Sequence, residues 1–182
     1  SFYLQVLCTE GIDSSACIAV FTESHRFLFN CGEGIQRLCV EHKVRLSKIR
    51  AVMFTDFSPQ HVFGLPGLSL TAADAGNNNI RVAGPIQLKS FLHTTRHFMK
   101  LPDGLLNFHT TTEQSSCIFN SSEVDLRMIS FDGHNNADNN CSSKRNCFVG
   151  RTPELKGKFD LQKAQALNVP KGPLFGKLKN GQ

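Results

Sequence analysis

A nearly continuous apolar segment, Val52-Met53-Phe54, lies inside a strand that we predict over residues 49–55. A strand that is apolar on both faces is typical of a sheet covered on both sides. A short polar loop follows it, and Gly64-Leu65-Pro66-Gly67 then begins a predicted helix. A buried strand that leads through a polar loop into a helix indicates a layered α/β fold.

Strand and helix patterns alternate along most of the chain. Alternating apolar residues predict a strand meander near its beginning, and Pro85 suits the first position of a helix. Strands are expected at residues 2–7, 17–21, 27–29, 49–55, 80–84, 124–129 and 148–149, and helices at 35–43, 65–75, 85–99 and 160–167. We therefore predict the α/β class, with sheets and helices in layers.

Charge and composition divide the chain. Residues 132–147 are rich in Asn, Asp and Ser and poor in apolar side chains, so we expect a flexible surface insert there. Residues 151–182 hold seven Lys or Arg against Glu154 and Asp160, whereas residues 1–150 hold 13 charges of each sign. We predict a domain over 1–150 and a basic arm over 151–182. Such an arm is typical of a nucleic-acid contact, although a charged tail is as often merely solvated.

Composition also narrows the class of protein. No apolar run approaches the roughly 18 residues of a membrane span, so no membrane contact is expected. The first residues already resemble a strand and not a signal peptide, and we expect a piece of a longer, intracellular protein. The seven Cys include no C-x-x-C pair, which favours buried reduced thiols over a disulfide framework or a cysteine zinc site.

The polar loop after the apolar strand carries Asp56, Ser58, Gln60 and His61. It resembles the junction that carries His-x-His-x-Asp-His in the metallo-β-lactamase superfamily and binds two zinc ions. Asp56 and Ser58 would occupy the two His positions, Gln60 the Asp position, and His61 alone keeps its residue type. Zinc is held by imidazole, thiolate or carboxylate ligands at about 2.0–2.2 Å, so Ser and a carboxamide are poor replacements.

The resemblance therefore implies the frame of a zinc site without its chemistry. His134 lies where that superfamily places another metal histidine, and with the four loop residues it is expected to be vestigial, with no metal and no catalytic residue in this chain. Two alternatives stay open: His61 and His134 hold a metal weakly, or Asp56 acts as a general base. His93 and His97, four apart on a predicted helix, lack the Glu of H-E-x-x-H and are expected to be exposed.

Two further segments make the resemblance more specific. Residues 27–37, Phe-Leu-Phe-Asn-Cys-Gly-Glu-Gly-Ile-Gln-Arg, resemble the DCGEG.Q segment of ribonuclease Z, with Asn30 in place of the usual Asp. Residues 156–160 and 169–181 are similar to the Gly/Pro-rich arm by which ribonuclease Z grips tRNA. A degenerate zinc motif followed by an intact arm resembles the amino-terminal half of the long form. The resemblance implies a partial metallo-β-lactamase-like αββα sandwich with a protruding arm.

For function, the resemblance implies tRNA 3′-end processing. The whole protein would be an endonuclease that removes the 3′ trailer from precursor tRNA in the nucleus or mitochondrion. Zinc would belong to its carboxyl-terminal catalytic half, which is the expected partner together with precursor tRNA, and this half would need no cofactor. Its glycines would admit phosphates, its proline would limit entropy loss and its lysines would attract them. The expected RNA-binding residues are Lys171, Gly172, Pro173, Phe175, Gly176, Lys177 and Lys179.

Two rival functions differ in class. An independent metallohydrolase would use His61, His134 and unusual further ligands, and it would bind metal. A protein-docking module without RNA contact would use residues 1–150 to dock and the basic tail only as a linker.

Overall fold

The computed structural model describes residues 2–9, 11, 15–109, 115–132, 144–154, 160–167 and 175–177. The chain divides into two compact units, Ser1–Thr152 and Pro153–Gln182. The first unit contains two sheets and four α-helices among its described residues, and the second contains one short helix.

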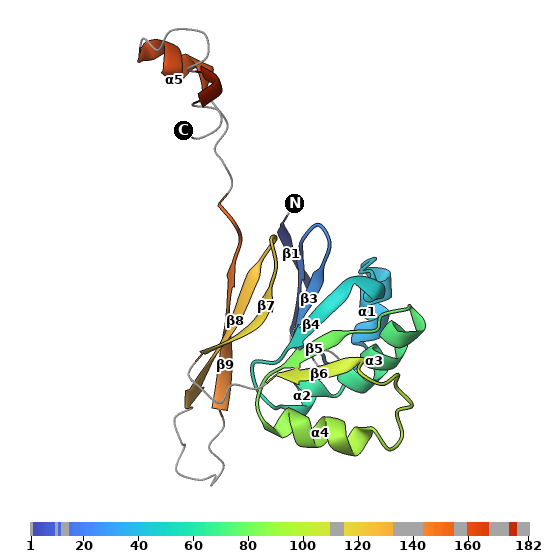
Figure 1. Cartoon of the computed structure of the whole chain (residues 1–182). Helices are drawn as coiled ribbons and strands as arrows, with labels where there is room; N and C mark the ends of the chain where they lie inside the picture. Colours follow the sequence, from blue (N-terminus) through green and yellow to red (C-terminus); the bar gives the residue numbers. More distant parts are fainter. Residues whose placement is uncertain are drawn as a thin grey trace. The chain divides into compact units, whose positions relative to one another are not determined.

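A six-stranded sheet lies at the centre of the first unit, with its strands in chain order (Figure 1). The first three strands form the predicted antiparallel meander, and the third to the sixth pair in parallel. Ala51, Val52 and Met53 are fully buried, which confirms the predicted two-sided cover of the apolar strand. The strands are β1 (Tyr3–Cys8), β2 (Cys17–Phe21), β3 (Arg26–Phe29), β4 (Ile49–Met53), β5 (Ile80–Ala83) and β6 (Leu106–His109).

Helices cover one face of this sheet (Figure 1). Fully buried Leu65, Leu68 and Leu88 pack there against Leu28 and Val52 of the strands. Burying one such side chain contributes about 1.5–3 kcal/mol, so this layer holds the helices in place. No described helix is long and apolar enough to cross a membrane. The helices are α1 (Ile35–Glu41), η1 (Leu46–Lys48), α2 (Pro59–Val62), α3 (Leu65–Asp74) and α4 (Gln87–Thr95).

An antiparallel sheet covers the opposite face (Figure 1). Phe27 of the large sheet meets Phe119 edge to face with ring centroids 5.1 Å apart, and Met53 and Met128 are fully buried in the same cluster. The described residues thus form the helix, sheet and sheet layers of an αββα arrangement. The strands of the second sheet are β7 (Ser115–Asn120), β8 (Asp125–Asp132) and β9 (Lys144–Arg151).

The predicted surface insert at 132–147 is shorter than expected. Both of its ends belong to strands, because β8 continues to Asp132 and β9 begins at Lys144. The β9 strand forms through its pairing with β8 along its whole length, although residues 144–147 have little apolar pattern of their own. Residues 133–143, including His134, lie outside the described residues. Strands β6 and β7 were not predicted either.

Four cysteines lie in the core region of the first unit. Cys17, Cys31 and Cys39 are buried and Cys8 is half-buried. Burial raises the pKa of the Cys39 thiol to about 12 and raises that of Cys31 as well, so both stay protonated at neutral pH. This agrees with the predicted buried thiols, whereas Cys117 and Cys147 are exposed.

The second unit contains α5 (Leu161–Ala166). The carboxylate of Asp160 accepts hydrogen bonds from the backbone N–H groups of Gln162 (3.0 Å) and Lys163 (3.2 Å), which confirms the predicted cap. Leu161 and Leu167, predicted to form one apolar face with Ala164, are 49% and 77% exposed.

Candidate functional site

Two loops meet where the parallel strands β3 and β4 end. The backbone N–H of Cys31 donates to the carbonyl of His61 (2.7 Å), and the N–H of Gly64 donates to the carbonyl of Cys31 (2.9 Å). The hydroxyl of Ser15 donates to the carbonyl of Gln60 at 2.5 Å. These bonds fix the loop after β4 against the loop after β3, and we call the pair of loops the β3–β4 junction (residues 30–34 and 54–64).

Glycines make this close approach of two backbones possible. A Cβ at Gly64 would lie 1.7 Å from the carbonyl oxygen of Gly32, and a Cβ at Gly32 would lie 2.6 Å from the carbonyl oxygen of Gln60. Neither backbone atom can move away cheaply, so both positions require glycine. The Gly-rich segment after β3 therefore serves packing within the junction, in agreement with its predicted role as a tight strand-to-helix turn.

Asp56 and His61, two of the predicted vestigial residues, bind each other. The Nδ1 of His61 donates to Oδ1 of Asp56 at 2.8 Å, and the backbone N–H of Ser58 donates to the same oxygen at 3.0 Å. Partial burial raises the pKa of the Asp56 carboxyl, but the hydrogen bonds from His61 and Ser58 outweigh it and leave the pKa below its ordinary value. Asp56 is therefore a carboxylate held in a local turn, not a base with a raised pKa.

Asn30 supports the junction from β3. It has a left-handed backbone (φ 62°), which Asn tolerates better than most residues, and it is 8% exposed. Its side-chain oxygen accepts hydrogen bonds from the N–H (3.1 Å) and the hydroxyl (3.2 Å) of Thr55. The segment resembling DCGEG.Q thus ties the end of β3 to the end of β4.

The residues of the junction do not fit a pair of zinc ions. Gln60 is exposed, Ser58 offers only a hydroxyl, and the Nδ1 of His61 is engaged by Asp56. Within the described ranges, no three His, Cys, Asp or Glu side chains come together in a way that could hold a metal ion. His93 and His97 lie exposed on and just after α4, as predicted, with ring centroids 6.3 Å apart.

Three of the predicted RNA-binding residues fall within the described part of the arm. Phe175, Gly176 and Lys177 are helical, which corrects the expectation of an extended, polyproline-like loop. The proline that suggested an extended segment is equally suited to the first turn of a helix, so the sequence was ambiguous here. Lys171, Gly172, Pro173 and Lys179 lie outside the described residues.

Asn146 is a junction residue that the sequence did not reveal. It is 4% exposed, and its backbone N–H donates to the carbonyl of Thr55 at 2.8 Å. Its side chain accepts a hydrogen bond from the Ser130 hydroxyl (2.7 Å) and donates to the carbonyl of Phe54 (3.4 Å). Because Asn146 stands in a polar segment, no periodicity distinguished it from a surface residue.

Known proteins resemble this chain over the same residues. The family model described as tRNase Z endonuclease matches residues 5–62, which include the junction up to α2. Over 179 residues the chain is 37% identical to the mitochondrial ribonuclease Z of Drosophila melanogaster, a match that covers 98% of the chain and 22% of that relative. The chain belongs to the ribonuclease Z family. It is also 40% identical, over 96 residues, to the zinc phosphodiesterase ELAC protein 2 of Rattus norvegicus, covering 53% of the chain and 12% of that protein.

The chain thus spans only about a fifth of the long ribonuclease Z that it matches over almost its whole length. This agrees with the predicted correspondence to the amino-terminal half of the long form. The same family supplies the nearest named functions, tRNase Z and ribonuclease Z.

Solved structures confirm the fold. The short form of human tRNase Z superposes with a TM-score of 0.66 at 19% identity, over 82% of this chain and 63% of that one. A long-form RNase Z from yeast gives 0.62 at 22% identity, over 71% and 18%. The metallo-β-lactamase fold protein YhfI from Bacillus subtilis gives 0.59 at 10% identity, over 81% and 57%. At these identities the likeness concerns the fold alone, and it confirms the predicted metallo-β-lactamase-like sandwich.

Proposed function

We propose that this chain is the non-catalytic amino-terminal part of a ribonuclease Z that removes the 3′ trailer from precursor tRNA. The observation that carries the proposal is the β3–β4 junction. Its frame is complete, but Asp56 and His61 are hydrogen-bonded to each other, and Ser58 and Gln60 stand where metal ligands would be needed. Cleavage then depends on a second half of the same protein.

The catalytic half would supply the zinc ions, and the zinc phosphodiesterase named among the relatives supports metal use there. Exposed apolar side chains of Tyr3, Leu4 and Val6 on the edge strand β1 support docking against another part of the protein. The mitochondrial name of the Drosophila relative supports a mitochondrial location, and the nucleus is the second compartment that we propose.

The arm would hold precursor tRNA through its phosphate backbone. The last 32 residues carry an excess of five positive charges, equal to that of the whole chain. Lys171, Lys177 and Lys179 would supply attraction that is independent of sequence, and Phe175 an apolar face for a ribose or base. Such a contact raises the rate by positioning the substrate and contributes no reactive group.

The full-length protein tests this division of labour. Replacing Asp56 and His61 together by Asn should leave kcat for trailer removal unchanged within about twofold. Replacing Lys171, Lys177 and Lys179 by Gln should raise KM by about tenfold or more with a much smaller effect on kcat, because ground-state and transition-state binding are lost together.

Two results would contradict the proposal. A large fall in kcat for the Asp56/His61 variant, with unchanged folding by circular dichroism, would favour the independent metallohydrolase. An unchanged KM for the lysine variant would favour the docking module whose basic tail is only a linker.

A further inference from the structure

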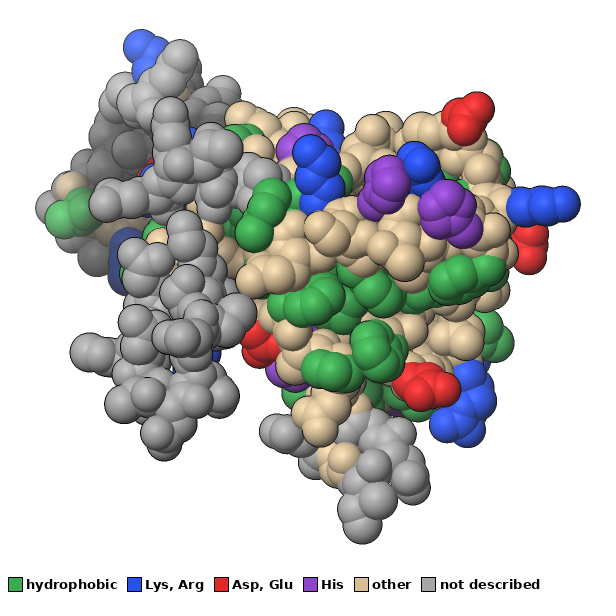
Figure 2. Space-filling model, turned by 90° about the horizontal axis from the view of Figure 1, so that it is seen from below, with side chains coloured by type: hydrophobic (Ala, Val, Ile, Leu, Met, Phe, Trp, Pro, Cys, Tyr) green, Lys and Arg blue, Asp and Glu red, His purple; other side chains and the backbone are tan. Residues whose placement is uncertain are grey.

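A second basic surface lies far along the chain from the arm. An open groove of about 720 Å³ separates α4 from the segment 99–108 that leads into β6. We call it the α4 groove, and Figure 2 shows this side of the molecule, with two His side chains beside Lys and Arg side chains. It is lined by Lys89, His93, Arg96 and His97 on one side, and by the half-buried Leu92 and Phe108 among its apolar walls.

The sequence around the groove contains no opposing charge over a long stretch. Between Asp74 and Asp103 there are four Lys or Arg residues, two His and no Asp or Glu. Asp103 lines the groove as its one carboxylate, against Lys89 and Arg96. Since residues 1–150 as a whole are neutral, this concentration of positive charge is local.

The cations of this surface are exposed and unpaired. Lys89, Arg96 and Lys100 are exposed, and within the described part of the chain they form no salt bridge. Other cations are engaged within the fold: Arg127 pairs with Asp125 at 3.0 Å, and Arg81 donates to the carbonyl of Ile118 at 2.6 Å. Unpaired cations that share one surface repel each other, which an anionic ligand would relieve.

The spacing of these cations suits a polyanion. Lys89, His93, Arg96 and Lys100 recur every three or four residues, so they form a row with about one helical turn, roughly 5.4 Å, between neighbours. Successive phosphates of an RNA strand have a similar separation. The apolar walls formed by Leu92 and Phe108 offer a surface for a ribose or a base.

We propose that the α4 groove is a second contact surface for the phosphate backbone of RNA, in addition to the arm. The inference rests on the proposed function, because the family supplies the reason to choose RNA over an acidic peptide. Two separated contact surfaces would fix the orientation of a bound tRNA, which one arm alone fixes less well.

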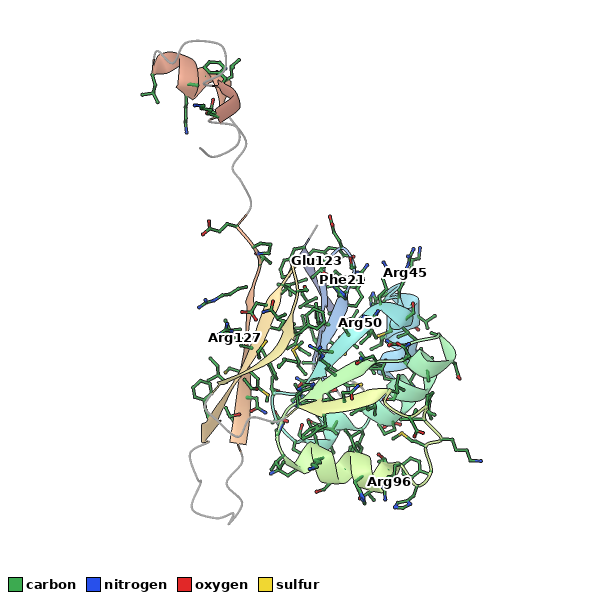
Figure 3. The ribbon with its side chains drawn as sticks, in the orientation of Figure 1. Phe21, Arg45, Arg50, Arg96, Glu123 and Arg127 are labelled. Atoms are coloured by element: carbon green, nitrogen blue, oxygen red, sulfur yellow. The ribbon has the colours of Figure 1, made fainter. Side chains whose placement is uncertain are left out.

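Charge reversal in the whole chain 1–182 tests the groove. The test variant is Lys89→Glu with Arg96→Glu, and the matched control is Arg45→Glu with Arg145→Glu. The control changes the net charge equally at exposed positions outside the groove, and Arg45 lies well apart from Arg96 in Figure 3. A milder variant, Lys89→Gln with Arg96→Gln, replaces the first if that one melts at a lower temperature. Precursor-tRNA binding is measured at several salt concentrations, with a poly-glutamate peptide as second probe.

We expect the groove variant to bind precursor tRNA about tenfold more weakly, with a salt slope smaller by about 1.4–1.8, and the control to change by less than about twofold. Binding equal to that of the control would overturn the inference. So would weaker poly-glutamate binding with unchanged tRNA binding, which would indicate a site for acidic peptides. The arm variant Lys171→Gln, Lys177→Gln and Lys179→Gln, measured in parallel, separates the two proposals: loss there alone would refute the groove but not the arm.

Discussion

The hydrogen bond between Asp56 and His61 determines what the loop after β4 can do. It engages the two groups of the junction that are chemically most suited to a metal or a proton transfer. With Ser58 and Gln60 at the other two positions, the loop closes on itself. At this scale the loss of chemistry follows from side-chain type, while the loop keeps its conformation.

The lowered pKa of Asp56 predicts a pH-dependent contribution to stability. A carboxyl whose pKa falls on folding stabilises the native state above its unfolded pKa of 3.8, and this contribution is lost as the pH falls through the folded value. Asp56→Asn should therefore lower the free energy of unfolding by about 0.5–1 kcal/mol at pH 7, a small value because the pair is partly solvated. The difference from the unmodified chain should vanish below about pH 3.

Urea unfolding at pH 7, 5 and 3 measures this difference. Asp103→Asn, at an exposed position before β6, is the control and should leave the free energy of unfolding unchanged. A difference between the Asp56 variant and the unmodified chain that increases on acidification would contradict the assignment.

The elements around the junction show how far sequence patterns reach. The meander, the buried strand β4 and helices α1, α3 and α4 were predictable because apolar periodicity and glycine or proline signals agree there. Strand β9 was not, because its residues 144–147 are polar and its pairing with β8 holds it in place. Asn146 and Ser15, which bind junction carbonyls, depend on contacts between distant segments that no local pattern records.

Close packing of the two loops predicts a sharp contrast between neighbouring glycines. Gly64→Ala should destabilise the chain by about 3 kcal/mol or more, because its Cβ would lie 1.7 Å from the carbonyl oxygen of Gly32. Gly67→Ala, one turn further along α3, would meet only the flexible side chain of Gln36 at 3.1 Å. It should be neutral or stabilising by up to about 1 kcal/mol, since Ala is the better helix former.

Chemical denaturation of the two variants and the unmodified chain measures the contrast. Equal stability of Gly64→Ala and Gly67→Ala would show that the two loops do not pack as described.

At the scale of the whole molecule, the chain combines a retained fold with a redistributed function. The first unit preserves the helix, sheet and sheet layers of its family, and it holds as many acidic as basic residues up to residue 150. The excess positive charge lies in the last 32 residues, and a local concentration lies at the α4 groove. A ribonuclease Z half of this kind would act by holding and orienting precursor tRNA for a catalytic half.

The measurement that tests this account most directly is the salt dependence of precursor-tRNA binding by residues 1–182, with and without the arm substitutions at Lys171, Lys177 and Lys179. We predict that the unmodified chain binds with an affinity that falls steeply with salt, and that replacing the three lysines by Gln reduces the slope by about 2–3. Equal affinity and slope for both chains, or no binding by either, would contradict the account.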